Sequence, residues 1–228
     1  MLGCSRWTDW ESVAVGIRLD WRNWSDWLRG LPMMIATARK MTLEEFLTYD
    51  DGTEAYYELV DGELVKMGAE CTINTRIPVF LIKCFILLGI EIDRIGIKQM
   101  IAVPRGSATA RDPDLMIHSE ASARAIDGAK QACLRLGDPN PLLVIEVVSP
   151  GTVKSENYER DYLEKRSEYA SRGIQEFWLV DPPREVVLVL VLDERGDYGE
   201  VEFRGEDTIV SSMFPEFKLT ASRVLAAR

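Results

Sequence analysis

One carboxylate interrupts the apolar stretch Leu142-Leu143-Val144-Ile145-Glu146-Val147-Val148. The stretch is short, continuously apolar and rich in branched residues, which is typical of a strand buried on both faces of a sheet. An unpaired carboxylate costs several kcal/mol to bury, so Glu146 needs a partner. A divalent cation is one candidate, and the sequence around the neighbouring strands offers further ligands.

Two other residues complete a possible catalytic set. Asp114 follows Pro113 at the start of a strand expected over residues 114–118, and Lys165 lies in a helix expected from about Tyr158 to Arg172. Phosphodiester hydrolysis needs an activated water and stabilisation of negative charge, and Mg²⁺ supplies much of both. The order of Asp114, Glu146 and Lys165 therefore predicts a metal-dependent nuclease site.

Each candidate also has a structural explanation. Asp114 could end a turn, and Lys165 could form an exposed helical ion pair with Asp161, worth about 0.3–0.5 kcal/mol. Glu58 is either an exposed strand residue or a further metal ligand. His118 shares the strand face of Asp114 by the period of two, but a lone histidine is more often a packing or surface residue.

Composition limits the classes of protein. The 228 residues are 46% hydrophobic and 28% charged, which is typical of a soluble globular domain. The four cysteines have no paired short spacing, and there is a single histidine, so oxygen ligands that favour Mg²⁺ or Mn²⁺ remain. The apolar stretch from Ile77 to Ile90 is too short for a membrane span, and no secretory signal begins the chain, so we expect a cytoplasmic protein.

The net charge of −10 opposes nucleic-acid binding, because affinity for DNA comes largely from basic side chains that neutralise phosphates. We therefore expect weak intrinsic affinity for DNA unless a homodimer or another partner adds positive surface. Cutting both strands needs two sites, and the apolar strands after Asp181 could offer an edge for a homodimer.

The first 34 residues differ in composition from the remainder. They hold Trp7, Trp10, Trp21, Trp24 and Trp27, five of the six tryptophans of the chain. Such a segment could bind a partner or a membrane surface, but an appended leader outside the core is the simpler interpretation. We expect residues 1–34 to be an extension and residues 35–228 to form a single domain.

Turn and capping signals divide this domain into strands and helices. Thr42 and Glu45 form a capping box, Asp61-Gly62 favours a two-residue hairpin turn, and Gly173 suits a helix end. The region from 121 to 131 gives no clear signal. Helices are expected over residues 42–47, 74–88 and 158–172, and strands over 57–65 as a hairpin, 95–103, 114–118, 142–148, 176–180 and 186–192, with a final hairpin around Gly196.

Four motifs resemble a known family. They are Glu58-Leu59-Val60-Asp61-Gly62-Glu63-Leu64, Pro113-Asp114, Ile145-Glu146-Val147-Val148-Ser149-Pro150, and the stretch from Tyr169 to Pro182 that reads YASRGIQEFWLVDP. In this order they resemble the Uma-type restriction-endonuclease-like family of the PD-(D/E)xK nuclease superfamily, over about Thr42 to Leu219.

This resemblance implies an α/β (α+β) fold with a mixed β-sheet flanked by helices. It implies that Asp114 and Glu146 are metal ligands, that Glu58 completes the acidic site, and that the backbone carbonyl of Val147 is a further ligand. Superfamily sites usually place a lysine two residues after the acid, where this chain has Val148. The family moves the lysine to the next helix, which indicates Lys165.

The leading hypothesis is a DNA endonuclease that uses Mg²⁺ or Mn²⁺ to direct water onto phosphorus. The alternative is a nuclease fold that serves as a noncatalytic binding module, because a fold does not fix a function. A glycosidase with paired carboxylates ranks last, because nothing in the sequence indicates a sugar cleft.

Overall fold

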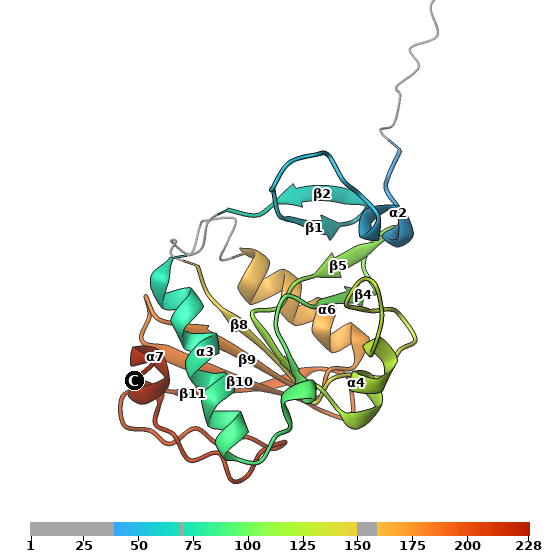
Figure 1. The fold of residues 1–228 in the computed structure, drawn as a ribbon. Helices are drawn as coiled ribbons and strands as arrows, with labels where there is room; N and C mark the ends of the chain where they lie inside the picture. The colour runs from blue at the N-terminus through green and yellow to red at the C-terminus, as the bar shows by residue number, and fades with distance from the viewer. Residues whose placement is uncertain (1–38, 69–70, 150–158) are drawn as a thin grey trace, which may run out of the picture. The chain divides into compact units, whose positions relative to one another are not determined.

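Two mixed β-sheets and their flanking helices make up the described part of the chain (Figure 1). The computed structural model describes residues 39–68, 71–149 and 159–228, and residues 40–228 form one compact unit. The elements in chain order are α2 (Leu43–Leu47), β1 (Tyr57–Val60), β2 (Glu63–Lys66), α3 (Thr72–Leu87), η2 (Ile92–Arg94), β3 (Ile95–Gly96), β4 (Met100–Val103), β5 (Thr109–Arg111), β6 (Leu115–Ile117), α4 (Glu120–Ile126), β7 (Cys133–Leu134), β8 (Leu143–Val147), the π-helical turn η3 (Arg160–Glu164), α6 (Lys165–Arg172), β9 (Glu176–Asp181), β10 (Val186–Leu192), β11 (Tyr198–Phe203) and α7 (Ala221–Ala226).

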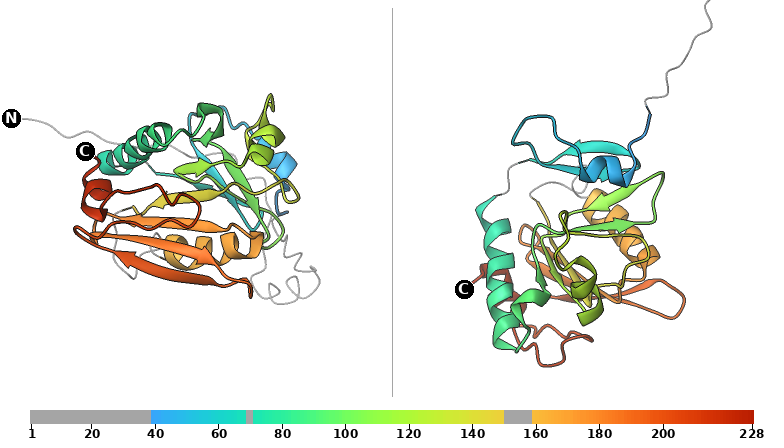
Figure 2. Two further views of the ribbon diagram at one scale, coloured as in Figure 1. Left: turned by 90° about the horizontal axis from the view of Figure 1, so that it is seen from below. Right: turned by 45° about the vertical axis from the view of Figure 1, so that its right-hand side comes forward.

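The six-stranded sheet has the order β11-β10-β9-β8-β6-β3 and is covered by helices on both faces. β8 is parallel to β9 and antiparallel to β6. Alternate residues of β8 enter two different cores: Ile145 and Val147 pack with residues of α3 and α7, whereas Val144 packs with Tyr169 of α6. This explains the continuous apolar pattern of β8, because both of its faces are buried. Figure 2 shows the strands between these helices.

The five-stranded sheet has the order β2-β1-β5-β4-β7, with β4 and β7 parallel. Ile101 and Val103 of β4 belong to the same buried cluster as Tyr169, so this sheet packs against α6 as well. α6 therefore lies where both sheets can contribute side chains. The expected fold class, a mixed sheet flanked by helices, is confirmed, although the strands divide into two sheets.

Three local signals in the sequence act as predicted. The Thr42 side chain accepts a hydrogen bond from the Glu45 amide, and the Glu45 carboxylate accepts one from the Thr42 amide. Asp61 and Gly62 both have positive φ, 49° and 79°, as a primed hairpin turn requires. Gly173 ends α6 in the left-handed region at φ 85°.

Other expectations need correction. The single strand expected over residues 95–103 is two strands, β3 and β4, in different sheets, because the chain turns at Lys98 with φ 54°. The helix expected over residues 74–88 is α3, which begins two residues earlier, at Thr72. Of the strands after Asp181, β10 lies between β9 and β11, and β11 forms an edge of the six-stranded sheet. The region 121–131, for which the sequence gave no clear signal, begins with most of α4 (Glu120–Ile126).

The Trp-rich extension, residues 1–34, and Tyr158 at the expected helix start lie outside the described residues. Among the described residues, no helix has the length and apolar character that crossing a membrane requires. The homodimer and the cytoplasmic location remain predictions.

Candidate metal and nuclease site

The pairing of β6 with β8 brings two predicted carboxylates together. Leu115 is opposite Ile145, so continuing the register by one residue places Asp114 opposite Glu146. Residues directly opposite in an antiparallel pair are close neighbours on one face of the sheet. The Oδ2 atom of Asp114 accepts a 2.6 Å hydrogen bond from the Val147 amide. Asp114 therefore lies beside the strand that carries Glu146.

The backbone of Val147 is unusual within this pairing. The Val148 amide donates to Val180 of β9, so the backbone groups of Val147 point the other way, towards β6. The residue opposite Val147 in the continued register is Pro113, which has no amide hydrogen to donate. The Val147 carbonyl accepts a long 3.4 Å hydrogen bond from Asn74 Nδ2. A proline thus leaves a backbone oxygen without its ladder donor, next to two carboxylates.

Glu146 has two partners from the helix that covers its face. Its Oε2 atom accepts a hydrogen bond from Lys165 Nζ at 2.7 Å, and its Oε1 atom accepts one from the Tyr169 hydroxyl at 2.6 Å. The side chain is buried, and the pKa of Glu146 is raised to about 8: burial raises it most, Lys165 lowers it, and the charges of Asp114 and Asp161 raise it. A nearby cation would favour the charged form.

Lys165 is buried, with 3% of its surface exposed. Its Nζ atom lies 2.7 Å from Glu146, 3.5 Å from Asp161 and 3.9 Å from Glu58. The ion pair with Asp161 considered from the sequence is present, but the expectation that it is exposed is wrong, because both side chains are buried. The π-helical turn η3 precedes Lys165, and such turns are frequent at functional sites.

Glu58 reaches the same region from β1. It is buried, which excludes the exposed strand position, and it accepts hydrogen bonds from Arg111 Nη1 at 3.0 Å and from the Asp112 amide at 3.2 Å. Burial alone would raise the pKa of Glu58, but the charges of Lys165 and Arg111 outweigh burial and hold that pKa below its ordinary value. The structure thus brings Glu58, Glu146 and Lys165 together from three separate segments.

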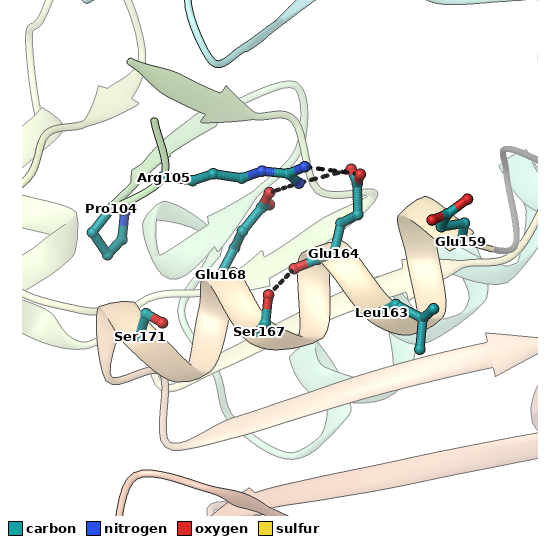
Figure 3. Close-up of a pocket in the computed structure, with 8 residues that line it drawn as sticks. All are labelled: Pro104, Arg105, Glu159, Leu163, Glu164, Ser167, Glu168 and Ser171. Atoms are coloured by element: carbon teal, nitrogen blue, oxygen red, sulfur yellow. Dashed lines mark hydrogen bonds and ion pairs between the residues drawn. The ribbon is translucent and has the colours of Figure 1, made fainter. Parts of the chain in front are cut away.

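A second layer of ion pairs supports these residues, and sequence reasoning missed it. The Arg111 Nε atom donates to Glu168 at 2.7 Å, and Arg105 lies 2.8 Å from Glu164 and 2.5 Å from Glu168. Figure 3 shows Arg105 reaching over η3 and α6 to both glutamates, beside a surface cavity of about 400 Å³. The spacing of four residues between Glu164 and Glu168 was the available signal, because such residues share a helix face.

The charges of this network do not balance. With every carboxylate ionised, the described residues contribute six carboxylates and four cations, which leaves two negative charges, the amount that one divalent ion offsets. Because the pKa of Glu146 is raised to about 8, the second of these charges forms fully when a cation binds beside it. The carboxylates are Glu58, Asp114, Glu146, Asp161, Glu164 and Glu168, and the cations are Arg105, Arg111, Arg160 and Lys165. Within the described ranges, however, no three His, Cys, Asp or Glu side chains are grouped closely enough to hold an ion by themselves.

His118 does not join the site. It is buried, with Nε2 2.7 Å from Gln99 Oε1 and Nδ1 3.1 Å from Ser122 Oγ. Burial lowers the pKa of His118 to about 4, and the charge of Arg94 acts in the same direction. The packing role considered from the sequence is the one that the structure supports.

Comparisons with known proteins agree with this architecture. The model of the Uma2 family, described as "Putative restriction endonuclease", matches residues 43–222. The chain belongs to this family. The resemblance inferred from the four motifs is thereby confirmed for the Uma2 core, whereas the roles of individual residues are not tested by the match.

A solved structure has the same fold as this Uma2 chain. It is the crystal structure of a "putative nuclease belonging to DUF820 from Anabaena variabilis ATCC 29413", with a TM-score of 0.62 and 19% sequence identity. The likeness covers 82% of this chain and 98% of that one. At this identity it shows the fold alone. No protein with curated annotation matches the chain.

Proposed function

We propose that this protein is a metal-dependent endonuclease that hydrolyses phosphodiester bonds of DNA with Mg²⁺ or Mn²⁺. The observation that carries the proposal is the placement of Asp114 opposite Glu146. The Val147 carbonyl lies beside this pair, and Pro113 has no amide hydrogen to donate to it. Membership of the Uma2 family supports a nuclease, and the proximity of Asp114, Glu146 and Lys165 supports their assignment to its site.

The residues fit a hard divalent cation. Asp114, Glu146 and the Val147 carbonyl offer only oxygen ligands, which Mg²⁺ and Mn²⁺ prefer. Two excess negative charges in the surrounding network favour a doubly charged ion. Three protein ligands leave further positions to water and to substrate, as is usual for Mg²⁺ in enzymes that act on phosphates. When bound, the ion would lower the pKa of a coordinated water and stabilise charge on the phosphate.

The side chains around these ligands have separate tasks. Tyr169 holds Glu146 Oε1 by a hydrogen bond and so fixes the direction of the carboxylate. Lys165 supplies a permanent positive charge next to Glu146, which can orient the attacking water or stabilise negative charge on the phosphate. Glu58, held by Arg111, keeps a second carboxylate within 3.9 Å of the Lys165 ammonium group. Lys165 can thus turn away from Glu146 without losing all of its countercharges.

The test is cleavage of supercoiled plasmid DNA with Mg²⁺ or Mn²⁺ by the native protein and by Asp114→Asn and Glu146→Gln. Both substitutions keep the shape of the side chain and remove its charge, so we expect activity to fall by at least 100-fold. Glu216→Gln, an exposed carboxylate near the C-terminus, is the control and should cut as the native protein does. Equal cleavage by all four proteins would reject the proposal.

A second candidate is a noncatalytic binding module. It is favoured by the net charge of −10 and by the complete pairing of Glu146 with Lys165 and Tyr169 without an ion. Calorimetric titration distinguishes the two. The nuclease should release or absorb heat at millimolar Mg²⁺ or Mn²⁺, and Asp114→Asn should abolish this signal, whereas a noncatalytic module gives none in either protein.

A further inference from the structure

The cations of the acidic network differ in how exposed they are and in how many of their N–H groups already donate to carboxylates. Arg111 has 1% of its side chain exposed, and its Nε, Nη1 and Nη2 atoms all donate to carboxylates. Lys165 is equally buried and lies against three carboxylates. Neither group can approach a phosphate that stays on the surface of the protein.

Arg160, at the start of η3, differs from both. Its side chain is 20% exposed, and it binds Asp161 through Nε at 2.9 Å and Nη2 at 3.4 Å. Within the described residues, no acceptor takes a hydrogen bond from its Nη1 group. One edge of the guanidinium is therefore held by Asp161, while another N–H group remains available at the surface.

Arg160 also interacts electrostatically with the carboxylates of the candidate site. Burial lowers its pKa, but Asp161, Glu58 and Glu146 together outweigh burial and raise the pKa of Arg160 above its ordinary value. The positive charge of Arg160 in turn opposes the charge of Lys165. Arg160 is thus close to the same carboxylates as Lys165, on the side that solvent reaches.

A DNA backbone that approaches this cluster meets strong repulsion. The network carries an excess of negative charge, which reaches two charges when Glu146 is ionised, and the whole chain has a net charge of −10. A phosphate therefore needs a local cation with a free donor, and a guanidinium is well suited, because it stays charged and presents several N–H groups in a fixed plane. Asp161 would keep this plane oriented before the substrate binds.

We propose that Arg160 binds a backbone phosphate of the DNA substrate through its Nη1 group and so delivers the strand to Asp114 and Glu146. The inference rests on the proposed function and extends it, because it assigns the substrate contact to a residue outside the predicted catalytic set. Asp161 acts as the positioning residue for this guanidinium.

Binding of a fluorescently labelled DNA duplex, measured by anisotropy with Ca²⁺ in place of Mg²⁺, tests the inference without requiring cleavage. Arg160→Gln should lower the affinity by about tenfold, and the slope of log affinity against log salt should decrease by about 1, as expected for one lost phosphate contact. Arg160→Lys retains the charge, and it should restore part of the affinity.

Arg166 provides a matched control. It lies six residues later on the same helical segment, but it pairs with Glu200 and the Tyr198 carbonyl of β11. Arg166→Gln removes the same charge, and it should leave the affinity and the salt slope nearly unchanged. Circular dichroism of each variant verifies the fold; if Arg160→Gln does not fold, Arg160→Lys carries the test, with a loss of severalfold expected.

The outcomes separate the two proposals. Native affinity and salt slope in the Arg160 variants, or equal losses in Arg160→Gln and Arg166→Gln, would overturn the role of Arg160, as would the absence of DNA binding by the native protein. Plasmid cleavage that does not depend on Asp114 and Glu146 would instead overturn the proposed function, while the binding result for Arg160 would stand.

Discussion

At the scale of single residues, Glu146 connects the sequence to the site. A lone charge in an apolar strand required a partner, and the structure supplies Lys165 and Tyr169. The need for a partner could be predicted from the cost of burying a charge. The identity of the partners could not, because Lys165 has an adequate alternative in Asp161, four residues earlier. Tyr169 belongs to a motif of the family, but nothing in the sequence marks it as a partner of Glu146.

His118 gives a prediction at the same scale. Its pKa, about 4 in the folded protein, lies below the ordinary value of 6.5. Because the chain has one histidine, proton NMR should resolve a single imidazole titration, and we expect its midpoint near pH 4. A midpoint near 6.5 would contradict the buried, neutral ring.

The same shift predicts how stability depends on pH. Above pH 6.5 the ring is neutral in both states. Between pH 6.5 and 4 only the unfolded chain binds the proton. As the pH falls through this window, His118 should therefore lower the free energy of unfolding by about 3 kcal/mol. Below pH 4 both states bind the proton, and His118 lowers the free energy of unfolding no further. Urea unfolding of the native protein and of His118→Gln checks this, because the variant should lack that part of the slope.

At the scale of elements, strong local signals located correctly the first hairpin, the first helix and the end of α6. The local signals did not predict strand boundaries that are set by contacts between distant segments. Residues 95–103 resemble one strand, yet Lys98 adopts a left-handed conformation. Lysine gives no signal of such a turn, because glycine, asparagine and aspartate are the residues that usually adopt this conformation. β5 was missed because it has only three residues and is stabilised by its neighbours in the sheet.

Two hairpin turns provide a matched test of packing. Gly62 and Gly196 both have positive φ, 79° and 86°, so alanine is strained at either position, at a cost of about 1–2 kcal/mol. A Cβ atom at Gly62 would also lie 2.5 Å from Ser107 Oγ and 2.6 Å from Lys40 Cβ, whereas at Gly196 it meets nothing within 4 Å.

We therefore expect Gly62→Ala to lower the free energy of unfolding by at least about 1 kcal/mol more than Gly196→Ala, because overpacking adds to backbone strain. Chemical denaturation of both variants measures the difference. Equal losses would mean that the chain around Lys40 and Ser107 moves aside without cost, and that the β1–β2 hairpin is not held as tightly as the structure indicates.

At the scale of the whole molecule, the candidate site depends on contacts between distant segments. Glu58, Arg111, Glu146 and Lys165 come from both sheets and from the helix between them. The family resemblance indicated three of the six carboxylates, but a single sequence does not encode which arginine meets which glutamate across more than fifty residues. The supporting pairs of Arg105 and Arg111 could therefore not be predicted.

The proposed function requires that Asp114, Glu146 and the Val147 carbonyl share one divalent cation. A crystal structure of the protein soaked in Mn²⁺, with anomalous diffraction recorded at the manganese edge, tests it most directly. We predict one strong anomalous peak within coordination distance of oxygens from all three residues, with the Lys165 ammonium group moved away from Glu146. Anomalous peaks only elsewhere, or none at saturating Mn²⁺ while Glu146 stays bonded to Lys165 and Tyr169, would show that these residues do not share a cation.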